Sequence, residues 1–206
     1  MTKLFLSLAV TVSTLVLAQE NTKPTSSPVS FGLKAGFNLS RVSSDYAEFK
    51  AGFNGGAFVN IPVSSKFSVQ PEVIYNGLGA QHYTYYYYSD YYAYYVDYTD
   101  ARLNLDYISV PVMLQYNILP ELYVEAGPQF GFLVGTHVRV NGESVKVKKD
   151  YEGFDFGIGL GVGYYFTPNI GITGRYTAGI TDILKNNPGS SVRNNAFQIG
   201  MAYNFR

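Results

Sequence analysis

The stretch that most constrains the fold runs from Leu105 to Gly135, with the sequence LDYISVPVMLQYNILPELYVEAGPQFGFLVG. Its two halves alternate between apolar residues and polar or small residues, on either side of the short break 117–121. A period of two over this length predicts β-strands, and the short break predicts a hairpin. Each strand is longer than the five or six residues typical of soluble sheets and matches the roughly 9–11 residues of a strand that crosses a bilayer at a tilt.

One face of this hairpin is apolar on both strands. It consists of Ile108, Val110, Val112, Leu114 and Tyr116 on the first strand, and of Leu122, Val124, Ala126, Pro128, Phe130, Phe132 and Val134 on the second. The opposite face carries polar and small residues, among them Glu125 and Gln129. A strand whose two faces differ in this way separates an apolar medium from a polar one.

The same alternation recurs along the rest of the chain. Strands are predicted at 30–41, 51–61, 66–79, 151–166, 170–181 and 193–205, which with the hairpin makes eight. Long loops are expected at 42–50, 80–104, 136–150 and 182–192, and tight turns at 62–65, 117–121 and 167–169. Short turns at one rim and long loops at the other predict an all-β fold, an eight-stranded antiparallel up-and-down transmembrane β-barrel with an interior filled by side chains.

The N-terminus has the pattern of a secretory signal peptide. Lys3 precedes an uncharged apolar run, and Val16 and Ala18 place small residues before a cut at Gln19. Three segments are therefore expected: a signal peptide at 1–18, a flexible periplasmic leader at 19–29, and an outer-membrane β-barrel domain at 30–206. The chain contains no cysteine, which excludes disulfides, thiolate metal sites and a lipid-anchored precursor. Its net charge of zero gives no reason to expect nucleic acid as a partner.

The alternation does not by itself say which face of the barrel points outward. A secreted lipocalin-like carrier would point its apolar face inward, around an apolar ligand. Bulky Phe, Leu, Ile and Val fill one phase of nearly every strand, whereas the other phase of 154–166 is mostly glycine. Small and hydrogen-bonding residues suit a narrow lumen and bulky apolar residues suit lipid, so we predict the apolar face outward. A small pore or transport protein is a further alternative.

Several segments resemble the PorT-like, "porin family" outer-membrane β-barrels of Gram-negative Bacteroidetes. They are FGLKAGFNLS, LDYISVPVMLQYNI, LYVEAGPQFGFLVG, FDFGIGLGVGYYF, GRYTAGITDI and the closing FQIGMAYNF. The resemblance covers the chain after the signal peptide and implies a place in the outer membrane, with both termini periplasmic. It also implies insertion by the outer-membrane assembly machinery, which recognises a C-terminal strand with alternating aromatics. Phe197, Tyr203 and Phe205 fit that pattern, whereas the final Arg206 departs from it.

Charged and amide residues on the inward phase form a predicted interior polar plug. Its members are Lys34, Glu72, Glu125, Gln129, Asp155 and Arg175. A buried charge has to be paired, so we expect salt bridges and hydrogen bonds that link the strands. A path for protons or ions is the alternative.

No residue pattern indicates catalysis. The two histidines, His82 and His137, fall near the rim with the long loops, and nothing in the sequence places a nucleophile beside them. We therefore expect no enzyme activity, no cofactor and no metal.

The segment 83–98 has an unusual composition, because it contains ten of the chain's 20 tyrosines. They are Tyr83, Tyr85, Tyr86, Tyr87, Tyr88, Tyr91, Tyr92, Tyr94, Tyr95 and Tyr98. Tyrosine is enriched in binding surfaces, so one interpretation is a surface loop that contacts an extracellular protein or glycan. The other is a pair of extended strand ends that continue the barrel, with aromatic residues at the membrane interface.

Overall fold

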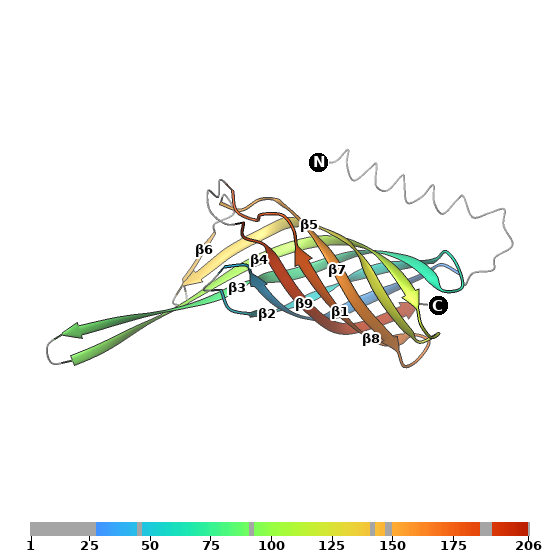
Figure 1. Cartoon of the computed structure of the whole chain (residues 1–206), viewed down its shortest axis with the longest axis horizontal. Helices are drawn as coiled ribbons and strands as arrows, with labels where there is room; N and C mark the ends of the chain where they lie inside the picture. The colour runs from blue at the N-terminus through green and yellow to red at the C-terminus, as the bar shows by residue number, and fades with distance from the viewer. Residues whose placement is uncertain are drawn as a thin grey trace.

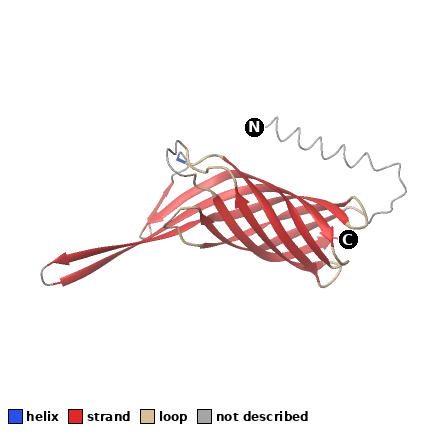
Figure 2. Ribbon diagram, in the orientation of Figure 1, coloured by secondary structure: helices blue, strands red, loops and turns tan. Residues whose placement is uncertain are grey.

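The computed structural model describes residues 28–44, 47–90, 93–140, 143–146, 150–185 and 191–205. These residues form a closed antiparallel barrel of eight strands and a ninth, short strand outside it (Figures 1 and 2). The barrel strands are β1 (Ser30–Val42), β2 (Lys50–Pro62), β3 (Phe67–Asp90), β4 (Ala93–Asn117), β5 (Leu122–Val140), β7 (Phe154–Tyr165), β8 (Ile170–Gly179) and β9 (Asn194–Phe205). The short strand β6 (Glu143–Lys146) pairs with the end of β5. The predicted eight-stranded barrel is confirmed.

Each barrel strand pairs with its neighbours in sequence, and the pairing of β1 with β9 closes the sheet. The first and last strands meet along their length, from Phe31 opposite Phe205 to Val42 opposite Asn194. At each tight turn, at 62–67, 117–122 and 165–170, a backbone hydrogen bond spans the turn. Closure leaves no strand edge facing lipid, which a bilayer requires because it offers no hydrogen-bond partners.

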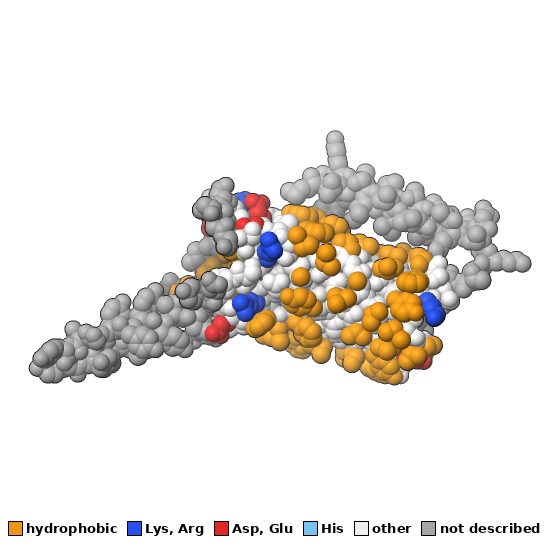
Figure 3. Space-filling view, in the orientation of Figure 1, with side chains coloured by type: hydrophobic (Ala, Val, Ile, Leu, Met, Phe, Trp, Pro, Cys, Tyr) orange, Lys and Arg blue, Asp and Glu red, His pale blue; other side chains and the backbone are white. Residues whose placement is uncertain are grey.

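The two faces of the wall differ as the alternation predicts. On β1 the outward side chains of Phe31, Leu33 and Phe37 are 59%, 51% and 71% exposed, whereas the inward side chains of Lys34 and Asn38 are buried. Figure 3 shows the result as an apolar band over the visible face of the barrel, with charged side chains at its two ends. The apolar face therefore points outward, and the alternative of an apolar, ligand-filled interior is wrong.

Two segments expected to be loops are largely strand. The segment 80–104 continues β3 and β4, which pair in one unbroken register from Phe67 opposite Tyr116 to Asp90 opposite Ala93. The segment 136–150 contributes the end of β5 and the whole of β6. Tyrosine, threonine and valine favour extended backbone, and a paired strand needs no apolar face to form. Two predicted strands were too long at the ribbon end. The strand predicted at 151–166 begins at Phe154 as β7, and the strand predicted at 170–181 ends at Gly179 as β8.

The outer part of the β3–β4 hairpin leaves the barrel as a two-stranded ribbon, drawn as the long projection in Figure 1. The continuous β2–β3 ladder ends at Asn54 opposite Asn76, and the β4–β5 ladder reaches Ala101 opposite Val140. Gly79 lies near this departure with a φ of 135°, a backbone conformation that favours glycine. A β-carbon there would also collide with the carbonyl oxygen of Leu103. We define the ribbon as residues 83–90 and 93–100.

In the described ranges, the structure contains no helix long and apolar enough to cross a bilayer.

Candidate functional site

Four charged side chains from four strands meet in the middle of the barrel lumen. Arg175 on β8 donates from Nη1 and Nη2 to the two carboxylate oxygens of Glu72 on β3, both at 2.8 Å. It also donates from Nε and Nη2 to Oε1 of Glu125 on β5, at 2.8 and 2.6 Å. Lys34 on β1 completes the set with a 2.6 Å contact from Nζ to Glu72 Oε1. We call these four residues the central ion cluster.

The central ion cluster is balanced and almost dry. It contains two cations and two carboxylates, and Lys34, the most exposed of the four, is only 8% exposed. Two amides complete the shell: Gln70 donates to Glu72 at 2.8 Å, and Gln115 donates to Glu125 at 3.0 Å. Each carboxylate oxygen is thus held by a charged or amide donor, an arrangement that compensates for removing these charges from water.

The side of the lumen nearest the tight turns is lined by amides and hydroxyls. Asn60 lies at its centre, with Nδ2 at 3.0 Å from Ser68 Oγ, 3.2 Å from Gln70 Oε1 and 2.8 Å from Gln115 Oε1. Between these groups and the turns lies an open cavity of about 520 Å³. We call it the turn-end cavity.

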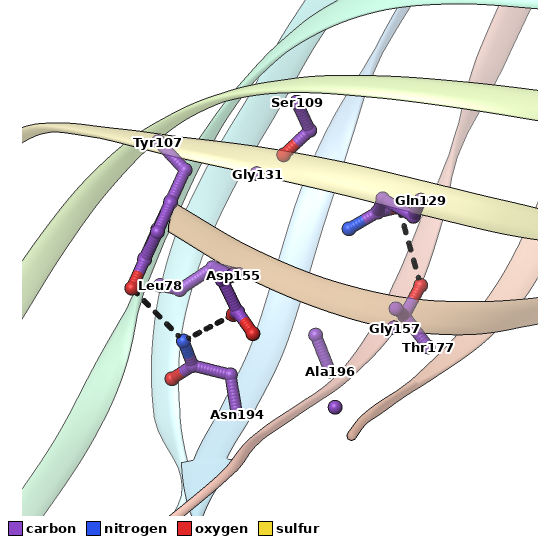
Figure 4. Close-up of a pocket in the computed structure, with 11 residues that line it drawn as sticks. Leu78, Tyr107, Ser109, Gln129, Gly131, Asp155, Gly157, Thr177, Asn194 and Ala196 are labelled. Carbon is purple, nitrogen blue, oxygen red and sulfur yellow. Dashed lines mark hydrogen bonds between the residues drawn. The ribbon is translucent and has the colours of Figure 1, made fainter. Parts of the chain in front are cut away.

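On the opposite side of the central ion cluster, amide side chains also line the lumen, and a second polar group surrounds Asp155. Figure 4 shows Asn194 donating to the hydroxyl of Tyr107 at 3.2 Å and to Asp155 at 2.8 Å. Thr181 donates to the other oxygen of Asp155, also at 2.8 Å. Asp155 is therefore held by neutral donors rather than by an ion pair among the described residues. The sixth predicted plug residue, Gln129, accepts a long 3.4 Å hydrogen bond from Thr177.

The structure thus places all six predicted plug residues inside the barrel but divides them into two groups. Lys34, Glu72, Glu125 and Arg175 form the central ion cluster, whereas Asp155 and Gln129 lie nearer the ribbon. The inward phase could be assigned from the alternation. The partners could not, because they depend on how the closed barrel brings separate strands together across the lumen.

An apolar cluster that the sequence did not predict closes the lumen at the ribbon end. It is formed by Val42, Leu78, Ala80, Leu105, Tyr107, Leu133, Ile183 and Ala196. Ile183, 1% exposed, comes from the connection between β8 and β9, which folds back over the barrel mouth. Its backbone is fixed by hydrogen bonds from Glu152 N to Ile183 O and from Ile183 N to Val192 O, both at 2.9 Å. We call this the apolar cap.

Little space remains inside the wall between the apolar cap and the turn-end cavity. Two voids beside the central ion cluster and beside Asp155 measure about 20 Å³ each, enough for one water molecule. The lumen of the described barrel is therefore filled by side chains, as expected for eight strands.

The two histidines do not meet. His137 lies on β5 with Nδ1 at 3.9 Å from Asp106 Oδ2, and Asp106 in turn accepts a 2.7 Å hydrogen bond from the Tyr75 hydroxyl. The side chain of His82 falls outside the described part of the structure. Within the described residues, no cluster of three or more histidines or carboxylates has metal-site geometry.

The tyrosine segment is two-stranded in the part that the structure describes. Eight residue pairs form the ribbon, from Tyr83 opposite Asp100 to Asp90 opposite Ala93. Tyr91 and Tyr92 lie outside the described residues, as do the side chains of the other eight predicted contact tyrosines. What the structure adds is their register, in which Tyr85 lies opposite Tyr98 and Tyr88 opposite Tyr95.

An outward apolar band, a polar lumen and closure by eight tilted strands define an outer-membrane type of β-barrel. A family model described as "Outer membrane protein beta-barrel domain" matches residues 17–185. The chain belongs to this family, and it is an outer membrane β-barrel protein.

Two outer-membrane proteins of solved structure align with this chain. Neisserial surface protein A aligns with 87% of this chain and 100% of its own, at 17% sequence identity and a TM-score of 0.54. The attachment invasion locus protein Ail of Yersinia pestis aligns over the same shares, at 16% identity and a TM-score of 0.48. At such identities the likeness extends to the fold alone. No curated protein matches the sequence.

Proposed function

We propose that this outer membrane β-barrel has a structural or surface-interaction role, and that the ribbon contacts an extracellular protein or glycan. The observation that carries the proposal is the length of the ribbon. Eight residue pairs at about 3.3 Å per residue extend it roughly 25 Å past the last residues that pair with β5. A projection of this length adds nothing to closure of the barrel.

The chemistry of the ribbon supports contact with a partner. Successive residues of a strand alternate between faces, so the opposed pairs Tyr85–Tyr98 and Tyr88–Tyr95 fall on opposite faces of the ribbon. Both faces therefore carry tyrosine, which combines large contact area with low conformational entropy. Among the described residues, no third strand pairs with 83–90 or 93–100, which leaves backbone donors and acceptors along both edges.

The test compares three forms of the full chain displayed on intact cells. Six ribbon tyrosines are changed to threonine in one variant and to phenylalanine in the other: Tyr85, Tyr87, Tyr88, Tyr94, Tyr95 and Tyr98. Threonine keeps the strand preference and removes the ring, whereas phenylalanine keeps the ring. We expect adhesion or glycan-array binding to be lost in the threonine variant and largely retained in the phenylalanine variant. Equal binding by all three forms would refute a role for the rings.

The proposal includes an orientation, with the ribbon outside the cell and both termini periplasmic. Because the chain contains no cysteine, single-cysteine variants report location without background. Thr84→Cys on the ribbon should react with a membrane-impermeant maleimide on intact cells. Ser65→Cys, in an exposed tight turn, should react only after the outer membrane is opened. The reverse pattern would overturn the orientation.

We further propose that the barrel is neither an enzyme nor a conducting pore. The paired carboxylates of the central ion cluster leave it no free base, and the small voids support a closed lumen. Steady single-channel conductance in a planar bilayer would contradict the second point. We also propose that the barrel contacts membrane lipid and that the outer-membrane assembly machinery inserts it. We propose further that it belongs to the PorT-like, Bacteroidetes-type subgroup, which the sequence segments that resemble this subgroup support.

A further inference from the structure

The turn-end cavity is much larger than the two voids beside the central ion cluster and Asp155, and it lies at the end of the barrel opposite to the ribbon. Residues of two tight turns form its rim, and Tyr123, Gln70 and Gln115 lie on its walls. Toward the middle of the barrel, the hydrogen bonds of Gln70 and Gln115 lead to the central ion cluster. A volume of about 520 Å³ falls within the roughly 300–1,000 Å³ of small-molecule sites.

The amides and hydroxyls on the walls of this cavity mostly bond to one another. Asn60 Nδ2 lies within 3.2 Å of oxygens on Ser68, Gln70 and Gln115, and Ser68 Oγ in turn donates to Gln115 Oε1 at 3.2 Å. The Oδ1 atom of Asn204, a residue that is 4% exposed, has no hydrogen-bond partner. A buried acceptor without a donor favours a ligand that donates a hydrogen bond to it.

Tyr123 adds a second buried group without a partner. It is 4% exposed, and its hydroxyl makes no hydrogen bond in the described structure. Its ring lies beside that of Tyr165, with the ring centroids 6.2 Å apart, and both residues line the cavity. A buried polar group without a partner costs about 1–3 kcal/mol, so it marks a position where a bound molecule would be stabilised.

The charge of the walls narrows the class of ligand. Lys66 is the one charged residue among the described residues that line the cavity, and it lies exposed in a tight turn. Such a site contains neither a cluster of cations for phosphate nor a carboxylate for a cation. Amides, hydroxyls and two tyrosine rings suit a neutral molecule with many hydroxyl groups.

We propose that the turn-end cavity binds a short neutral saccharide. One of its hydroxyl groups donates to Asn204 Oδ1, and another accepts from the Tyr123 hydroxyl. The tyrosine rings provide the apolar contact for the carbon face of the sugar. This site is separate from the ribbon and does not depend on the proposed function of the ribbon.

The test measures binding of maltotriose and of the N-acetylglucosamine trimer to the purified full chain. The protein is held in dimethyldodecylamine-oxide micelles, because detergents with sugar headgroups would compete. Isothermal titration and saturation-transfer NMR should both detect one bound saccharide per chain. Absence of binding at millimolar concentration, or stronger binding of inositol hexaphosphate than of either trisaccharide, would overturn the proposal.

Three variants and one control test whether the saccharide binds in the turn-end cavity. Asn117→Trp places a large ring at the cavity rim and should abolish binding. Tyr123→Phe and Asn204→Leu each remove an unpartnered polar atom and should weaken binding about tenfold without loss of barrel stability. Thr136→Val is the matched control, since Thr136 Oγ1 is also buried without a partner but lies far from the cavity, on the outer part of β5. Unchanged binding in Asn117→Trp, or equal weakening in the control, would refute the assignment.

Discussion

The two ends of the lumen are built from opposite chemistry. At the ribbon end, the apolar cap seals the barrel with a loop residue, Ile183, that is 1% exposed. At the turn end, amides and hydroxyls surround an open cavity of about 520 Å³. The central ion cluster separates them. A closed wall therefore does not determine its interior, since the same alternating strands enclose a packed apolar cap at one end and an open polar cavity at the other.

The largest effect on stability is expected from disrupting the central ion cluster, which separates the two ends of the lumen. Arg175→Leu leaves Glu72 and Glu125 buried without their main partner. The free energy of unfolding should fall by about 3–5 kcal/mol, the usual cost of breaking a buried ion pair from one side. Urea unfolding of the protein in micelles measures the change. The exposed Arg193→Leu is the control and should stay within about 0.5 kcal/mol. An unchanged midpoint for Arg175→Leu would mean that the ion pairs contribute nothing.

The next test compares one apolar residue from each end. Ile183→Ala opens a cavity in the apolar cap and should cost about 2–5 kcal/mol of stability. Ile118, in a tight turn, is 50% exposed, so Ile118→Ala should have little effect. Parallel unfolding curves of the two variants give the difference directly. Similar losses would show that the cap is no better packed than the turns.

A smaller effect is expected from crowding the wall beside the turn-end cavity. A β-carbon at Gly163 would collide with the ring of Tyr123, whereas one at Gly174 would meet no atom within 4 Å. Gly163→Ala should therefore cost about 1–3 kcal/mol, as overpacking usually does. Gly174→Ala should be close to neutral. The difference between the two unfolding midpoints is the measurement, and equal midpoints would contradict a fixed position for the ring.

The smallest effect is expected from the ribbon, which lies beyond the apolar cap. Residues 83–100 can be replaced by Asn-Gly, a two-residue turn that joins the paired residues His82 and Ala101. Barrel stability should change by no more than about 0.5 kcal/mol, because the lost pairs connect β3 and β4 to each other only. A large fall in the unfolding midpoint would show that the ribbon supports the barrel, and would weaken its proposed role in surface contact.

Much of the wall could be predicted from the sequence. The period of two in β1, β4, β5 and β7 identified the strands, their lipid face and the inward positions of residues such as Glu125 and Asp155. These predictions depend on local geometry, since side chains alternate in any strand. The tight turns were also placed correctly, because they are short and break the alternation.

The interior arrangement could not be predicted in the same way. Which cation faces Glu72 depends on closure, which brings the Arg175 guanidinium from β8 within 2.8 Å of the Glu72 carboxylate from β3 across the lumen. The apolar cap was missed because Leu78, Leu105 and Leu133 depart from the rule that inward residues are polar, and because Ile183 lies in a loop. For the ribbon the sequence left two interpretations open, a surface loop and a pair of extended strand ends, because its alternation lacks the apolar face by which the other strands were recognised. The register of β3 and β4 confirms the extended strand ends.

The unbroken β3–β4 register has a mechanical consequence. A pull on the ribbon tip runs parallel to both strands, whereas the hydrogen bonds to β2 and β5 lie across them. Many hydrogen bonds are then loaded in shear at the same time. They share the force and do not break one after another. We expect the barrel to hold the ribbon against large forces in single-molecule pulling, with extraction of the whole hairpin as one abrupt event.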